Sequence, residues 1–242
     1  MFTVYQLAPF CLKRGHLKVF LFRLLQGPVI KKGFILSVCF LAIVSVGLGI
    51  ENAETIQTDE VTILFEKRLK TAAQKTANIY PRVKADLKKT LNWELDFKPT
   101  IFLTNDRGRF EELTGNSLIV AYAIPQRNLI VIDYTKMSTR PFTLGAILKH
   151  ELCHLLLHQY IDKNNFPRWL DEGLCQWASD GIDEVIMDPK RSMLNQASLS
   201  GKFIPLRHLD KKFPYEKDLL LLAYEESKSF VAYLAGQFGV QG

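Results

Sequence analysis

The first fifty residues contain no aspartate or glutamate, although acidic side chains are frequent in the rest of the chain. They contain six lysines and arginines, which account for the whole formal net charge of +6. The remaining 192 residues therefore carry 25 basic and 25 acidic side chains and have no net formal charge. A domain that binds phosphate backbones needs an excess of basic residues on its surface. This distribution argues against nucleic acid as a partner.

Cysteine is scarce, with four residues in a chain of 242. Such a low density excludes a small scaffold held together mainly by disulfides. The chain also has no internal repeat and no low-complexity tract, and 48% of its residues are hydrophobic. This composition predicts one domain with a substantial core, preceded by a targeting segment.

Charged residues are missing from residues 33–50, GFILSVCFLAIVSVGLGI. A helix of this length can just span a bilayer core of about 30 Å. Lys31 and Lys32 precede the segment, and a basic flank normally stays in the cytoplasm. A buried core helix would show a polar stripe, which this segment lacks. We therefore expect a transmembrane signal anchor or a signal peptide at 33–50.

This topology divides the chain into three parts. Residues 1–32 form a basic cytoplasmic segment, and residues 33–50 contact the membrane. Residues 55–242 form a domain on the extracytoplasmic (periplasmic) side, which is exported if the signal is cleaved. Glu51 makes a poor cleavage site, which favours the uncleaved anchor. Translation from Val29 is an alternative start that gives a compact export signal.

The exported part shows predicted strands in its first half and mostly helices in its second. Apolar residues at helical spacing predict helices at 58–92 (with a break at Pro81), 106–114, 141–160, 167–187 and 218–238. Short apolar runs predict strands at 100–104, 118–123 and 129–133, the last two as a hairpin. Residues 188–217 read mostly as loop. This order predicts an α+β domain with a short mixed sheet and a helical half.

The helix predicted at 141–160 contains the sequence His150-Glu151-Leu152-Cys153-His154. Residues four apart on a helix lie on one face, so both imidazoles can bind one tetrahedral metal ion. Glu151 lies beside them and can act as the general base of a metalloprotease. Burying two imidazoles and a carboxylate in this apolar helix would be costly without a metal or other partners. We therefore predict one Zn²⁺ per chain, bound by His150 and His154.

A catalytic zinc site needs a third protein ligand. His158 is unsuitable because it lies about 12 Å along the helix axis from His150. Glu172 lies on the next predicted helix, which can pack against the first, and completes a His₂Glu ligand set. Asp171 is adjacent but would face a different direction on that helix. Glu172 is therefore the predicted third ligand.

The sequence HELCHLLLH, followed by PRWLDEGLCQW, resembles the gluzincin zinc metallopeptidases, in particular their peptidase-MA-like group. Residues 223–231, AYEESKSFV, are similar to a helix of the same family. The resemblance implies a zincin-like domain and a zinc-dependent endopeptidase that acts on peptides or proteins. It also implies that Tyr224 donates to the oxyanion of the reaction. The alternative is that Tyr224 only packs at a helix interface.

Two features depart from the family pattern. Gln176 stands where many gluzincins have an acidic residue that orients a ligand histidine, and the chain ends at Gly242, where related proteins continue. We therefore expect a domain shortened at its C-terminus. A non-catalytic zinc-binding interaction module, a membrane-anchored scaffold without metal and a different metal hydrolase remain as alternatives.

If the two helices pack, Cys153 and Cys175 meet and can form a disulfide, or they are buried as separate thiols.

Overall fold

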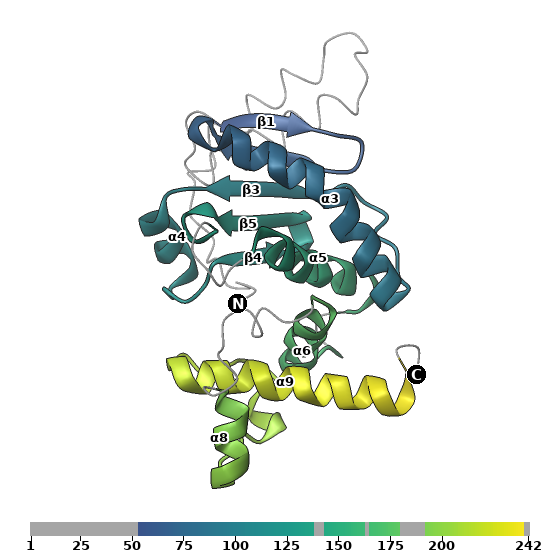
Figure 1. Cartoon of the computed structure of the whole chain (residues 1–242), viewed down its shortest axis with the longest axis vertical. Coiled ribbons are helices and arrows are strands. Elements are labelled where there is room, and N and C mark those ends of the chain that lie inside the picture. The colour runs from purple at the N-terminus through teal and green to yellow at the C-terminus, as the bar shows by residue number, and fades with distance from the viewer. Residues whose placement is uncertain (1–52, 138–142, 163–164, 180–191, 240–242) are drawn as a thin grey trace, which may run out of the picture. The chain divides into compact units, whose positions relative to one another are not determined.

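The computed structural model describes residues 53–137, 143–162, 165–179 and 192–239 (Figure 1). The predicted cytoplasmic segment 1–32 and membrane segment 33–50 lie outside the described residues and stay predictions. Of the helices in the described part of the chain, none combines the length and apolar character needed to cross a membrane.

Five strands form one mixed sheet in the order β1-β2-β3-β5-β4. They are β1 (Ala53–Gln57), β2 (Thr62–Glu66), β3 (Thr100–Thr104), β4 (Ala121–Ile124) and β5 (Leu129–Asp133). Strands β2 and β5 both run parallel to β3, and β4 runs antiparallel to β5 at one edge. The predicted α+β class with a short mixed sheet is therefore confirmed, as are the strand at 100–104 and the hairpin.

The helix predicted at 58–92 is wrong in its first part. Residues 62–66 form β2, and helix α3 (Lys70–Leu91) begins only at Lys70. Strand β2 pairs with strands on both sides in the sheet, and its residues 62–65 are all buried. A strand covered on both faces has a continuous apolar run, which sequence periodicity cannot distinguish from a buried helix. The expected break at Pro81 is also absent, because α3 continues through it.

The helices α4 (Arg107–Thr114) and α9 (Lys217–Phe238) confirm two further predictions. Asp106 caps α4 by accepting a hydrogen bond from the Arg109 N–H, and Gly115 ends it at a φ of 66°. Helix α6 (Arg168–Ala178) ends earlier than the predicted 187, and residues 180–191 lie outside the described part.

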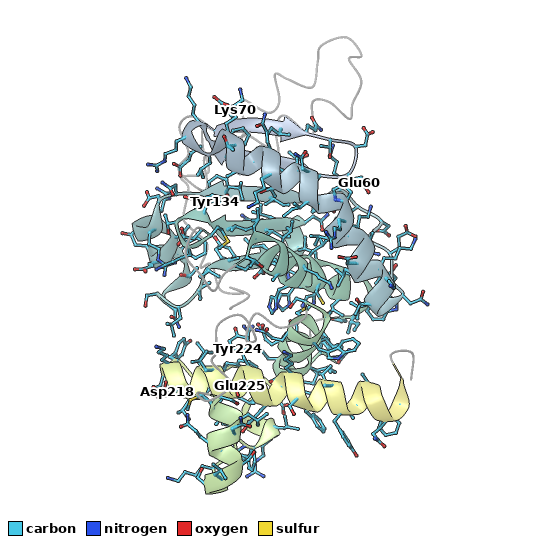
Figure 2. All side chains as sticks on the ribbon, viewed as in Figure 1. Glu60, Lys70, Tyr134, Asp218, Tyr224 and Glu225 are labelled. Carbon is cyan, nitrogen blue, oxygen red and sulfur yellow. The ribbon has the colours of Figure 1, made fainter. Side chains whose placement is uncertain are left out.

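Helix α8 (Met193–Ser200) occupies part of the predicted loop at 188–217. Its first turn is held by Glu225, which lies on α9 beside Tyr224 (Figure 2). The Glu225 carboxylate accepts hydrogen bonds from the Leu194 N–H at 2.7 Å and from the Ser192 hydroxyl at 2.6 Å. The helix also has local signals that the loop prediction did not use, because Ser192 caps its N-terminus by accepting from the Asn195 N–H and Gly201 ends it at a φ of 68°.

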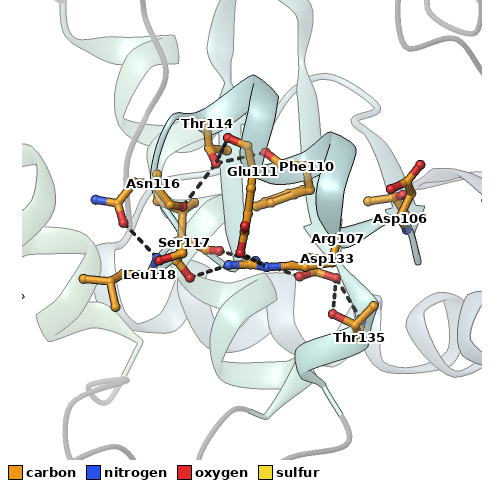
Figure 3. Close-up of polar contacts among 12 residues, drawn as sticks. Asp106, Arg107, Phe110, Glu111, Thr114, Asn116, Ser117, Leu118, Asp133 and Thr135 are labelled. Atoms are coloured by element: carbon orange, nitrogen blue, oxygen red, sulfur yellow. Dashed lines mark hydrogen bonds and ion pairs between the residues drawn. The ribbon is translucent and has the colours of Figure 1, made fainter.

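A partly buried arginine fixes the segment that leads into the edge strand β4 (Figure 3). Arg107 pairs with Asp133 at 2.8 Å, and Asp133 is fully buried at the end of β5. The same guanidinium donates to the carbonyl oxygens of Ser117 and Ile119 and to Glu111. Arg107 therefore ties helix α4 and the residues before β4 to the neighbouring strand.

Helices α3 and α5 (Leu144–Tyr160) pack against each other and against β2 and β4 of the sheet. Helix α6 packs between α5 and α9. Helices α6 and α9 approach closely at Gly173, where a Cβ atom would lie 2.6 Å from the backbone oxygen of Ser227. Only glycine permits two helix backbones to approach this closely. Gly173 therefore sets the distance at which α6 lies against α9.

We expect Gly173→Ala to destabilise the protein by about 3 kcal/mol, at the upper end of the cost of overpacking. The added methyl group meets backbone atoms of Ser227 and cannot be accommodated by a side-chain rotation. The matched control is Gly236→Ala in the exposed part of α9, where a Cβ atom has open space. That change should stabilise the helix by roughly 0.5–1 kcal/mol. Equal effects of both substitutions in urea unfolding would contradict this account.

Candidate metal centre

Helix α5 carries three of the predicted site residues, and its N-terminus is fixed by Thr143. The Thr143 hydroxyl accepts a hydrogen bond from the Ala146 N–H, which caps the helix. His150, Glu151 and His154 are each at most 1% exposed. Apolar residues surround α5 on most sides, so its polar groups lie within the core. Helix α6 presents the fully buried Glu172 to them.

Three side-chain atoms from these helices converge on one point. The Nε2 atoms of His150 and His154 are 3.1 Å apart, and each lies 3.5 Å from Oε2 of Glu172. Tetrahedral zinc with bonds of 2.0–2.1 Å holds its ligand atoms about 3.3 Å from one another. The structure therefore brings the three predicted ligands together at the separations that one zinc ion requires.

Several buried polar atoms of these residues lack hydrogen-bond partners, and a cation would give a partner to one of them. Within the described residues, His150 Nδ1, Glu151 Oε1 and Glu172 Oε2 are buried without a hydrogen-bond partner. Buried polar atoms normally have partners, because burial without one costs about 1–3 kcal/mol. Of these atoms, Glu172 Oε2 lies 3.5 Å from Nε2 of both histidines, so a cation bound at that position would give it a partner.

Arg168 holds the other oxygen of Glu172. Its Nη2 donates to Glu172 Oε1 at 2.7 Å, and the Arg168 side chain is 11% exposed. The guanidinium also lies over the ring of Phe213, 5.7 Å from its centre. Burial raises the pKa of Glu172, but Arg168 and His154 outweigh this effect and lower it well below its usual value. Glu172 is therefore an anion that presents one oxygen to the two histidines.

Asp171 contacts the other ring nitrogen of His154 from the one that Glu172 approaches. This agrees with the prediction that Asp171 faces a different direction from Glu172. Its Oδ1 lies 2.7 Å from His154 Nδ1, and its Oδ2 lies 3.1 Å from His158 Nε2. Sequence analysis missed this contact, although the spacing of four residues between His154 and His158 places both on one face of α5. Burial opposes ionisation of Asp171, but the charge and hydrogen bond of His154 lower its pKa to about 2.

The two histidines and the predicted base differ in their electrostatic surroundings. Burial lowers the pKa of His150 to about 4. Burial also lowers the pKa of His154, but Asp171 and Glu172 overcome this and raise it well above 6.5. Burial raises the pKa of Glu151 to about 8, which makes its carboxylate a stronger base than an exposed one.

Three further residues from the sequence analysis lie around the site. Cys153 and Cys175 are free, fully buried thiols in hydrogen-bonding contact, so they do meet. The Cys175 sulfur also lies 3.3 Å from His154 Nδ1. Tyr224 lies buried on α9, with its ring edge-on to Phe213 at 5.1 Å. Its predicted catalytic role stays a prediction.

We expect Arg168→Met to destabilise the metal-free protein by about 3–5 kcal/mol, because it leaves the buried Glu172 carboxylate without its cation. The double substitution Arg168→Met with Glu172→Met should recover most of this loss, since no buried charge then lacks a partner. Urea unfolding in the presence of a chelator measures both. A double variant as unstable as the single one would show that Arg168 acts through packing alone.

Comparison with known proteins identifies a family for the chain. The family model of the Peptidase MA superfamily matches residues 112–242, which is more than half of the chain. A solved structure of yeast LTA4 hydrolase in complex with Bestatin is similar, with a TM-score of 0.48 and 14% identity. The match covers 78% of this chain but only 31% of that chain, and a comparison with curated proteins found no match. The chain belongs to the Peptidase MA superfamily.

Proposed function

We propose that this domain is a zinc-dependent endopeptidase in which His150, His154 and Glu172 bind the metal and Glu151 is the general base. The observation that carries the proposal is the convergence of three ligand atoms at 3.1–3.5 Å beside the buried carboxylate of Glu151. Membership of the Peptidase MA superfamily supports a peptide or protein as substrate.

The charges around the site favour a divalent cation. The carboxylates of Glu151, Asp171 and Glu172 are buried there, and Arg168 is the cation paired with Glu172. Metal binding displaces any proton from Nε2 of the two histidines. With Glu151, Asp171 and Glu172 then ionised, these three carboxylates and Arg168 together carry a charge of −2. One divalent cation neutralises this charge, and imidazole nitrogen together with carboxylate oxygen is a donor set that suits zinc.

A bound zinc ion supplies Lewis acidity, which polarises a peptide carbonyl group and lowers the pKa of a water molecule to about 7. The protein contributes a base with a defined position. Glu151 is 1% exposed, and its Oε1 lacks a hydrogen-bond partner among the described residues, so it can accept a proton from water. The same carboxyl group can then give this proton to the leaving amine.

Tyr224 is the proposed donor to the oxyanion that forms on the substrate carbonyl group. Donors of this kind act best when their position is fixed before the reaction. Phe213 lies between Tyr224 and Arg168, in contact with the ring of one and the guanidinium of the other. This stack supports the proposal, because it links the tyrosine on α9 to the residue that holds Glu172.

The test is to measure zinc content and cleavage of a mixed peptide library with the full chain, Glu151→Gln and the surface control Glu112→Gln. We expect about one zinc ion per chain in all three proteins, because Glu151 is not a ligand. Cleavage should fall by about 10²–10⁴-fold in Glu151→Gln only, and a chelator should abolish it in the parent.

Two results would contradict the proposal in different ways. A folded parent protein without zinc would exclude the metal site. A parent that binds zinc but cleaves no peptide, before or after metal is added, would instead favour a non-catalytic zinc-binding interaction module.

A further inference from the structure

We propose that Asp171 is the positioning residue for His154. The inference rests on the proposed zinc site and concerns how the chain prepares one ligand of that site before the metal binds.

The contact between Asp171 and His154 determines which nitrogen of the imidazole is available. Asp171 Oδ1 lies 2.7 Å from Nδ1 of His154, and both residues are at most 4% exposed. An ionised carboxylate accepts hydrogen bonds only, so Nδ1 must carry the proton. Nε2 is then the nitrogen that can bind a metal, and it faces His150 and Glu172. The same hydrogen bond makes the imidazole a better electron donor.

His158 holds the second oxygen of this carboxylate. Its Nε2 lies 3.1 Å from Asp171 Oδ2, and its side chain is 4% exposed. Asp171 is therefore held between two histidines on one face of α5 and has little freedom to rotate. His158 does not reach the metal position, but it fixes the residue that orients His154. Asp171 also lies in the first turn of α6, where the helix dipole favours a negative charge.

The two proposed histidine ligands are prepared unequally. His154 has a carboxylate on its Nδ1, whereas Nδ1 of His150 is buried without a hydrogen-bond partner within the described residues. The chain therefore fixes the orientation of one imidazole before metal binding through Asp171, and that of the other mainly by packing. Loss of Asp171 should consequently affect metal affinity as well as fold stability.

The experiment measures the zinc dissociation constant of the full chain by competition with a chromophoric chelator at fixed pH. We expect Asp171→Asn to raise this constant by about 10- to 100-fold, the usual cost of losing a partner of a ligand histidine. The matched variant Gln176→Ala should change it by less than about threefold. Circular dichroism of each variant tests whether it is folded.

A second measurement needs no variant. In zinc-loaded protein labelled with nitrogen-15 at histidine, NMR should show a protonated Nδ1 on His154 that exchanges slowly with water. Coordination of zinc through Nδ1 of His154 would overturn the inference.

The outcomes separate this inference from the proposed function. A parent protein that binds no zinc overturns both. A parent that binds zinc tightly, with an Asp171→Asn variant that binds it equally well, overturns only the role of Asp171. A large loss of zinc affinity in Gln176→Ala, with little change in Asp171→Asn, would show that Gln176 positions a ligand histidine and Asp171 does not.

Discussion

Two carboxylates of α6 lie buried against the two imidazoles of α5, and most of the surrounding structure serves this contact. Glu172 approaches the Nε2 atoms and Asp171 approaches the Nδ1 atom of His154. Buried carboxylates are unfavourable unless each has a partner of opposite charge or hydrogen-bond donors. Arg168 and His158 provide such partners on the outer side of the contact. On the inner side Glu172 Oε2 has no hydrogen-bond partner among the described residues and lies 3.5 Å from both Nε2 atoms, where one cation would bind all three atoms.

The fold brings these helices together from two directions. The sheet and α3 support α5, and α9 supports α6 from the other side. Gly173 follows Glu172 directly and lets α6 approach the α9 backbone. The residue that sets the depth of α6 in the core is therefore adjacent to the one that reaches the histidines. A change in this packing would move the carboxylate as well as the helix, so stability and site geometry are coupled here.

Local sequence signals predicted the parts of the structure that depend on local interactions. The spacing of His150 and His154, the hairpin around Asn128 and the capped helix α4 all follow from contacts a few residues apart. Strand β2 was missed because its two covered faces remove the alternation that marks a strand.

The sequence predicted the groups that face the metal position, but not the groups that hold them from behind. Glu172 follows from the need for a third ligand, and its position agrees with the structure. The partners Arg168 and His158 and the second role of Asp171 depend on the rotation of α6 relative to α5. That rotation is set by tertiary packing and by the approach at Gly173, which no local pattern records.

The most direct test of the zinc site is X-ray absorption at the zinc edge on the metal-loaded full chain. We expect two imidazoles and oxygen donors at about 2.0–2.2 Å, with no sulfur ligand. Cys175 lies close enough to His154 and Asp171 to form a competing ligand set, and its sulfur would bind zinc at about 2.3 Å. A sulfur shell at that distance, or a single imidazole, would contradict the assignment of His150, His154 and Glu172 as the ligands.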